Sequence, residues 1–437
     1  MAKKVKYMKS LISGILLSFS VCLNCFAQSS QTYLIKAGKI YDSENNIFVE
    51  NQEILIQGDK IVSVGKDLAA HDSTVILDYS NSTITPGLID AHTHMLTEQK
   101  VNGDLVDDVI KQSEETRLLR AVKFAKSYLE AGFTSTRDLG NSGQYLDVEL
   151  RNAINKDYVV GPRMYVSGPI ISSYDGQFGG LPFKEHEKLT KLEYRLVNGT
   201  DDARLAVKEH IVQSVDVIKI LAFGNSLPLS LEEMKAIVET SHENRIKVTV
   251  HADRDWVVHN AIAAGVDGIE HGYNFKDSTF MVMAKKGIYF VPTYGSVEQA
   301  IHYYKTANLP YDLEEVKKGF QPTQERLRRA VELGVVIVAG SDAYFDLGIT
   351  RGDNAKQTLL GYYEAGLKAN DVLKTATFNA SLALNRENQI GVIKENAFAD
   401  IAVFEGDLET NFKESLFKVQ LVIKEGKIQY ENAFVKN

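Results

Sequence analysis

Apolar segments of strand length alternate with amphipathic segments of helix length between residues 84 and 385, and this alternation constrains the fold most strongly. We expect strands at Ile84–Ala91, Phe133–Arg137, Arg163–Val166, Asp216–Ala222, Lys247–His251, Gly268–Glu270, Ile288–Pro292 and Val335–Ser341. Strands that alternate with helices over this length predict an α/β fold of the (β/α)8 type, a TIM barrel. A doubly wound open sheet is the alternative, but it would more often carry a glycine-rich phosphate loop where this chain has Asp90-Ala-His-Thr-His94.

The two ends of the chain resemble each other and predict a second, smaller domain. Glu53–Gly65 and Val419–Tyr430 each contain two alternating apolar runs around a turn, which is the pattern of a β-hairpin. A lone hairpin is marginally stable in water, so we expect both ends to share one structure. Residues 28–84 and 386–437 are predicted to form a composite β-sandwich domain, with the barrel over residues 85–385 inserted between them.

Residues 1–27 have the pattern of a signal peptide. Lysines precede the apolar stretch Leu11–Leu23, and Cys25-Phe-Ala27 offers a small-x-small cleavage site. We expect the protein to be exported, periplasmic or secreted, with no membrane span after cleavage, because no other segment approaches transmembrane length. Both cysteines, Cys22 and Cys25, lie in this segment, and lipid attachment to one of them is the alternative to simple cleavage.

The charge balance excludes one class of partner. The formal net charge is −8, and no long block of like charges occurs. Nucleic acid therefore meets no basic surface on this chain. We expect a small-molecule substrate as the partner, and the sequence leaves homo-oligomer formation open.

Four histidines and one aspartate stand where predicted strands end. His92 and His94 are two residues apart, so the period of a strand places both imidazoles on one side. His251, His271 and Asp342 end the fifth, sixth and eighth strands. Any one of these histidines is more often an ordinary core residue, but barrel enzymes keep their active sites at this rim. The joint placement predicts a metal site, in which imidazole and carboxylate suit zinc best and would accommodate manganese, cobalt or iron.

Lys219 lies near the middle of a predicted strand, Asp216–Ala222, that has the composition of a strand buried on both faces. Buried lysines are rare, and burial favours their neutral amine. A neutral amine that points into a metal site can add carbon dioxide, and the resulting carbamate has two oxygens that can bridge two ions. An ion pair with Asp216, or a side chain whose head reaches water, is the alternative.

The ordered set resembles the amidohydrolase superfamily, specifically its imidazolonepropionase-like branch, which includes Xaa-Pro and Xaa-Arg dipeptidases. The resemblance covers essentially the whole mature chain and includes Thr85–His94, Gly132–Gly140, Gly161–Arg163, Ala264–Gly272, Gly340–Ala343, Ala376–Thr377 and Ala399–Asp400. It implies two divalent ions: His92, His94 and Asp342 would hold one, His251 and His271 the other, and a carbamate of Lys219 would bridge them.

Two segments depart from the family pattern. Imidazolonepropionases look like His-x-His followed by Gly and Arg, whereas Met95-Leu-Thr-Glu-Gln99 follows here. Many dipeptidases of this branch have Gly-Gly-His after the third strand, whereas this chain has Ser172–Gly180. The loops that contact the substrate are therefore not the usual ones, and Tyr174, Gln177, Arg254 and Asp255 are candidates for that contact without an assigned role.

These features together predict an exported metal-dependent amidohydrolase that cleaves dipeptides or N-acyl amino acids. We expect a hydroxide shared by two ions to attack the amide carbonyl, and Asp342 to be the catalytic residue that accepts its proton and passes it to the leaving amine. A lactonase or phosphotriesterase would need the same ions, and an imidazolone-type cyclic amide hydrolase is a further alternative. An exported binding protein on a barrel that has lost its activity is the alternative outside the enzymes.

Overall fold

The computed structural model describes residues 31–224 and 226–432. The predicted signal peptide, residues 1–27, lies outside the described residues. Among the helices that are described, none combines the length and apolar composition needed to cross a membrane.

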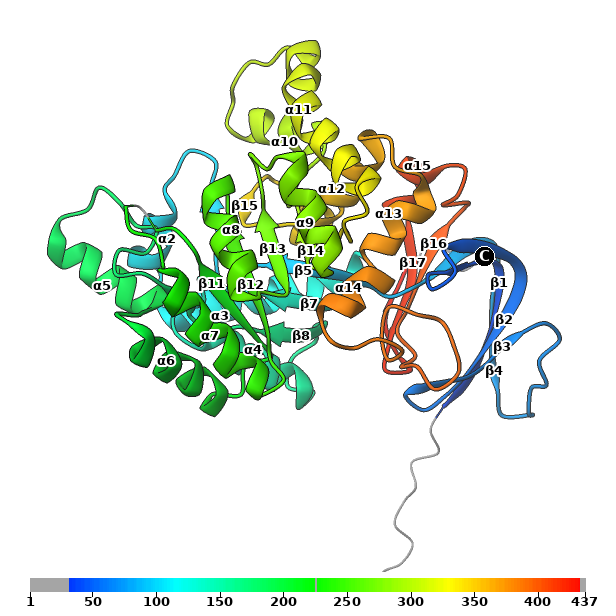
Figure 1. Cartoon of the computed structure of the whole chain (residues 1–437). Coiled ribbons are helices and arrows are strands. Elements are labelled where there is room, and N and C mark those ends of the chain that lie inside the picture. Colours follow the sequence, from blue (N-terminus) through cyan, green and yellow to red (C-terminus); the bar gives the residue numbers. More distant parts are fainter. Residues whose placement is uncertain (1–30, 225, 433–437) are drawn as a thin grey trace, which may run out of the picture.

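The central part of the chain forms parallel strands surrounded by helices (Figure 1). Seven of the predicted strands are present: β5 (Leu88–Thr93), β7 (Phe133–Asp138), β8 (Arg163–Val166), β11 (Val217–Leu221), β12 (Lys247–Ala252), β13 (Gly268–His271) and β14 (Tyr289–Val291). They pair in the orders β5-β7-β8 and β11-β12-β13-β14, and the short strands β9 (Ile170–Ser172) and β10 (Tyr194–Leu196) extend the second sheet beyond β11. All of these pairings are parallel, as a (β/α)8 barrel requires.

The predicted eighth strand, residues 335–341, closes the barrel with less regular pairing than the sequence predicts. Its backbone bonds to β14 through Val338 N and Phe290 O, 2.9 Å apart, and to β5 through Ala91 N and Ala339 O, also 2.9 Å apart. At Ser341 the backbone N–H donates to the Asp90 side chain over 2.9 Å, so a side chain replaces the next ladder bond. On the other side, Asp216 N bonds Val166 O at 2.8 Å and joins β8 to β11. The barrel prediction is confirmed.

Helices connect the strands and cover the barrel (Figure 1). The helices are α2 (Leu105–Lys111), α3 (Glu114–Glu130), α4 (Leu146–Asn155), α5 (Phe183–Glu193), α6 (Thr200–Val212), α7 (Leu231–Glu243), α8 (Asp255–Ala264), α9 (Asp277–Lys286), α10 (Val297–Thr306), α11 (Leu313–Glu332), α12 (Arg351–Glu364), α13 (Ala369–Thr375), α14 (Phe378–Ala383) and α15 (Phe412–Leu416). The sequence sets some of their ends directly: Ser230 and Glu233 form a reciprocal capping box at the start of α7. Short strands β6 (Gln99–Lys100) and β15 (Phe345–Asp346) pair above the barrel rim.

The two chain ends form a single seven-stranded sheet beside the barrel (Figure 1). Its order is β18-β17-β16-β4-β1-β2-β3, with β1 (Thr32–Asp42), β2 (Ile47–Gln57), β3 (Lys60–Gly65), β4 (Val75–Pro86), β16 (Ile401–Glu405), β17 (Val419–Lys424) and β18 (Lys427–Glu431). The N-terminal and C-terminal halves meet where β16 pairs antiparallel with β4. Side chains from both halves, such as Ile54 and Leu421, enclose one apolar core. The predicted sharing of one structure by the two ends is confirmed.

A buried ion pair joins this sheet to the barrel. Arg163 at the start of β8 bonds Asp400 and also Glu425, the latter over 2.7 Å, and Asp400 is 1 % exposed. Both Arg163 and Asp400 belong to the segments that carry the family resemblance. Although Arg163 and Asp400 are far apart in the chain, both belong to the contact that attaches the terminal sheet to the barrel.

Two glycines inside helices test how closely the helical layer packs. A Cβ on Gly352 in α12 would meet the Ser127 backbone oxygen and lie 2.6 Å from the Ala131 Cβ, whereas a Cβ on Gly319 in α11 has no heavy atom within 4 Å. We expect Gly352→Ala to lower the free energy of unfolding by about 1–3 kcal/mol because α3 backbone must move. Gly319→Ala should raise it by about 0.5–1 kcal/mol, because alanine favours the helix. Urea unfolding of both variants measures the difference, and equal effects would contradict the packing argument.

Candidate metal centre

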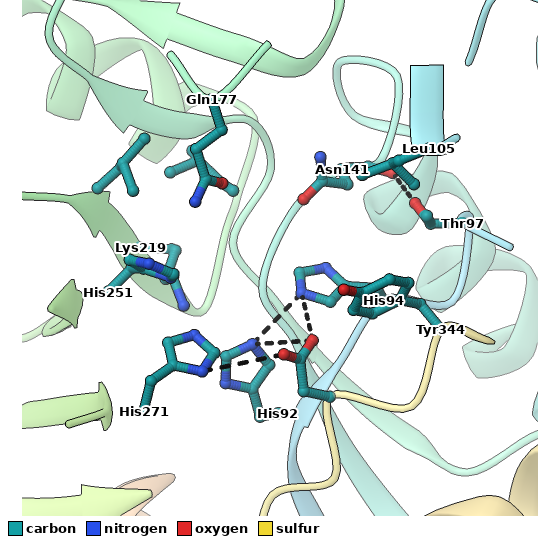
Figure 2. Close-up of a pocket in the computed structure, with 13 residues that line it drawn as sticks. His92, His94, Thr97, Leu105, Asn141, Gln177, Lys219, His251, His271 and Tyr344 are labelled. Atoms are coloured by element: carbon teal, nitrogen blue, oxygen red, sulfur yellow. Dashed lines mark hydrogen bonds and ion pairs between the residues drawn. The ribbon is translucent and has the colours of Figure 1, made fainter. Parts of the chain in front are cut away.

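The six predicted ligands come together in one pocket at the C-terminal mouth of the barrel. The pocket has a volume of about 110 Å³, and its lining includes His92, His94, Lys219, His251, His271 and Asp342. Figure 2 shows the four imidazoles and Lys219 around a common centre, with Asn141 and Gln177 facing it from across the pocket. Five separate strands supply these side chains, four of them at or just beyond the strand end and β11 through Lys219 in its middle.

The donor atoms of three residues are close enough to share an ion. His92 Nε2 and His94 Nε2 are 3.3 Å apart, and the Asp342 Oδ1 lies 3.2 Å from the second and 3.7 Å from the first. Asp342 Oδ1 is buried and accepts no hydrogen bond of good geometry from the described residues. A buried carboxylate oxygen without a hydrogen bond is costly, and a cation between these atoms would satisfy it. Two imidazoles and a carboxylate are a ligand set that suits zinc and similar divalent ions.

Hydrogen bonds at the rear of the His-x-His pair fix both rings. His92 Nδ1 lies 2.7 Å from Glu270 Oε2, and His94 Nδ1 lies 2.8 Å from the Gly140 backbone oxygen. Both partners are acceptors, so each Nδ1 carries the proton and each Nε2 keeps its lone pair toward the pocket. Metal-binding histidines are typically held in this way.

Glu270 is a functional residue that the sequence analysis did not single out. It is fully buried and accepts hydrogen bonds from Arg137, at 2.7 Å, and from Thr249 as well as binding His92. Burial opposes its charge, but Arg137 and His92 lower the pKa of Glu270 to about 2. The sequence could have indicated Glu270 by its position directly before His271 at a strand end. The period of two, however, suggests that neighbouring residues face opposite sides of a strand.

A left-handed backbone explains why Glu270 and His271 both point inward. His271 has φ of +73°, a conformation that a residue other than glycine adopts rarely. This breaks the alternation at the end of β13, and the imidazole turns to the pocket, where its Nδ1 lies 2.9 Å from Thr293 Oγ1. Asp342 has φ of +50° and is turned in a similar way. Strained backbone of this kind concentrates at functional sites.

Burial lowers the pKa of Lys219 and of the remaining histidines, His251 and His271, and so favours their uncharged forms. Lys219 is 2 % exposed, and burial lowers its pKa to about 8, although Glu270 and Asp342 partly oppose the shift. The alternative pairing with Asp216 does not occur, because Asp216 binds Arg151 at 2.6 Å. Burial and the Lys219 charge lower the pKa of His251 to about 3, and the ring centroids of His251 and His271 are 4.3 Å apart. Neutral imidazole is the form that binds metal.

Only one of the four candidates for substrate contact lines the pocket, namely Gln177. Tyr174 is 61 % exposed, the Arg254 guanidinium lies over the Phe223 ring at 4.1 Å, and Asp255 accepts a hydrogen bond from Thr279. The sequence analysis missed six other lining residues: Thr97, Leu105, Asn141, Ile170, Leu221 and Tyr344. Asn141 and Tyr344 follow strand ends within a few residues, which was the usable signal.

We expect the Glu270 carboxylate to stabilise the barrel as well as the site. Glu270→Gln keeps the shape but leaves the buried Arg137 guanidinium without its counter-ion, so the free energy of unfolding should fall by about 3–5 kcal/mol. The matched control is Glu405→Gln, which removes one partner of an exposed ion pair with Lys418 and should change stability by less than about 1 kcal/mol. Denaturant unfolding of the metal-free proteins gives both values, and similar losses in the two variants would refute the assignment.

Comparison with known proteins places this site in a family. The amidohydrolase family profile matches residues 83–429. Ochratoxinase of Aspergillus niger is 26 % identical over 350 residues, which cover 74 % of this chain and 70 % of that protein. Imidazolonepropionase of Thermoanaerobacter pseudethanolicus is 22 % identical over 395 residues, with coverages of 83 % and 86 %. The crystal structure of a Xaa-Pro dipeptidase with bound methionine in its active site superposes with a TM-score of 0.78 at 25 % identity, covering 92 % of this chain and all of that one. The chain is therefore a hydrolase of the amidohydrolase family.

Proposed function

We propose that this hydrolase is a metal-dependent enzyme that cleaves amide bonds in dipeptides or N-acyl amino acids outside the cytoplasm. The observation that carries the proposal is the convergence of His92, His94, Lys219, His251, His271 and Asp342 on one buried pocket. Export rests on the pattern of residues 1–27. The similarity to proteins named Xaa-Pro dipeptidase and ochratoxinase supports an amide substrate.

Two divalent ions, zinc first, are proposed for the pocket. His92, His94 and Asp342 would hold one ion, His251 and His271 the other, and a carbamate on Lys219 would link them. When bound, such ions make water acidic enough to serve as a nucleophile at neutral pH and polarise a carbonyl oxygen. The neutral amine is the form of Lys219 that adds carbon dioxide, and burial increases its share by lowering the pKa of Lys219 to about 8.

Asp342 is the proposed proton carrier. Burial would raise the pKa of Asp342, but His92, His94 and Lys219 hold it below its usual value, so the side chain is a carboxylate ready to accept a proton. Its Oδ1 faces His92 and His94, and its Oδ2 lies 3.9 Å from His271 Nδ1. A carboxylate in this place can take a proton from the attacking water and release it to the leaving amine.

Removal of the Asp342 charge tests the function and this role together. We expect the zinc- or manganese-loaded protein to contain close to two ions per chain and to hydrolyse members of a dipeptide and N-acyl amino acid library. Asp342→Asn should reduce kcat at least about 100-fold, as loss of a general acid–base does, while part of the metal remains. Metal analysis and kinetics measure the two effects. Full activity in Asp342→Asn refutes the role, and a wild type that binds no metal refutes the metal dependence.

If Lys219 carries a carbamate, a ¹³C NMR resonance of that group should depend on Lys219. Protein equilibrated with ¹³C-bicarbonate should show a carbamate resonance that is absent in Lys219→Ala, and this variant should lose metal and activity. A short carboxylate such as propionate could occupy the vacated space with two similarly placed oxygens, so it should restore part of the activity.

The matched control for Lys219 is Lys356, which is also buried, 1 % exposed, and has its pKa lowered to about 8 by burial. Lys356 faces the Phe417 ring at 5.4 Å instead of the metal pocket. Lys356→Ala should therefore keep the carbamate resonance and the metal content. Loss of the resonance in Lys356→Ala, or its persistence in Lys219→Ala, would refute the assignment of the carbamate to Lys219.

A further inference from the structure

Aromatic rings form a continuous path from the metal pocket toward the outer helices. The Tyr344 ring lies 6.2 Å from the His94 ring, measured between centroids, and Tyr344 stacks on Phe345 at 4.7 Å. Phe345 in turn contacts Tyr303 of α10 edge to face at 5.9 Å. Figure 2 shows Tyr344 beside His94 at the edge of the pocket. The path therefore begins at a metal ligand and leaves the barrel rim.

A second cavity lies along this path and adjoins the metal pocket, because Asp342 and Tyr344 line both. Its volume is about 280 Å³. Its apolar wall is formed chiefly by Tyr273, Ala300, Tyr303, Phe320, Tyr344 and Phe345. We call it the aromatic cavity.

Helix α10 lines the aromatic cavity without taking part in a hydrophobic core. None of its residues is fully buried, although it presents Ala300 and Tyr303 inward. Figure 1 shows α10 and α11 projecting above the rim of the barrel. The polar lining residues Gln299 and Asn354 bond each other at 2.7 Å. The wall thus offers apolar surface, and its two amide side chains already bind each other.

Volumes decide which part of a substrate each cavity can hold. An apolar cavity of about 150 Å³ is known to bind benzene. The metal pocket, at about 110 Å³, is smaller than this and can hold little more than the amide group itself. The aromatic cavity, at about 280 Å³, can hold a phenyl or indole ring.

The charge of the lining decides the chemistry of the occupant. Asp342 is the only charged residue among the described residues that line the aromatic cavity, and neither lysine nor arginine is among them. An anionic group would meet no cation there, whereas an uncharged ring would meet ring faces and edges. The occupant is therefore a neutral apolar group.

We propose that the aromatic cavity is a specificity subsite that receives an aromatic side chain attached on one side of the scissile amide bond. This inference rests on the proposed function and narrows it to amides that carry a ring. Tyr303 and Phe345 are the proposed specificity residues, and neither contacts the reacting atoms.

Matched substrates and a filled cavity test the subsite. A comparison of N-acetyl-phenylalanine with N-acetyl-alanine tests a ring on the amine side of the amide bond. A comparison of phenylacetyl-glycine with acetyl-glycine tests a ring on the acyl side. For one of these pairs we expect the wild type to favour the ring by about 10- to 100-fold in kcat/KM, the range that burial of one ring supplies. Ala300→Trp fills the cavity and should reduce this ratio at least about tenfold, and Tyr303→Ala should reduce it too.

The matched control is Tyr311→Ala. Tyr311 lies between α10 and α11 and stacks on Tyr304 at 5.7 Å, but it does not line the cavity. Tyr311→Ala should leave the ratio unchanged. A wild type without a ring preference in either pair, or a ratio that Ala300→Trp leaves intact, overturns the subsite.

Calorimetric binding of 3-phenylpropanamide against propanamide to the metal-loaded protein needs no turnover. Tighter binding of the ring compound that Ala300→Trp removes would uphold the subsite even if no amide were hydrolysed. Hydrolysis without any ring preference would instead uphold the function and refute the subsite.

Discussion

The Glu270 carboxylate at the centre of the barrel is the group on which the site depends. It binds His92 of β5, Arg137 of β7 and Thr249 of β12 from its own place on β13. Arg137 is fully buried and also donates to the Ala91 backbone oxygen and the Tyr289 hydroxyl, so one ionic cluster ties together most of the strands that carry ligands. Breaking a buried pair leaves a charge without compensation, which is far more costly than the net gain from forming it. The cluster therefore holds the strands and the His92 ring in one arrangement.

Burial has a second effect, on the protonation of the ligands. The pKa of His92 falls to about 4 because the ring is buried beside Lys219, although Asp342 and Glu270 oppose the shift, and burial and neighbouring histidines lower the pKa of His271 well below its usual value. The same burial favours the neutral Lys219 amine. The lowered pKa values favour neutral imidazoles at His92, His251 and His271, the form that binds a cation, whereas the pKa of His94 is raised because its contact with Asp342 outweighs burial. The barrel interior thus favours the cation-binding form of three of the four imidazoles.

The terminal sheet and the outer helices α10 and α11 differ in how firmly they are held and in what they contact. The seven-stranded terminal sheet encloses its own core and attaches through Arg163 and Asp400, near the start of β8 and away from the ligand-bearing ends of the strands. The helices α10 and α11, by contrast, have few fully buried residues and line the aromatic cavity that adjoins the metal pocket. Such elements can change without loss of the barrel core, so differences in substrate between amidohydrolases can arise there.

The sequence alone determined the elements with strong periodicity and the ligands at their ends. Alternating apolar runs located seven barrel strands and both terminal hairpins, because hydrophobic period and turn chemistry are local properties. The candidate ligands could be identified because five of them lie at or just beyond the end of a strand that must be buried, and Lys219 lies within such a strand. Their order along the chain also carries the family resemblance, which the family match confirms.

Tertiary structure alone decided what depends on contacts between distant segments. The eighth strand forms one isolated bridge to β14, at Ile337, and on its other side Asp90, far away in the chain, takes the Ser341 N–H in place of a backbone oxygen. Glu270 faces the site because His271 adopts a left-handed backbone, which the period of two does not predict. The aromatic cavity needs Tyr303, Phe345 and Tyr344 to meet, and no local pattern links these positions. Local periodicity fixes which face of an element is buried, but the partner across the interface is set only when the whole chain packs.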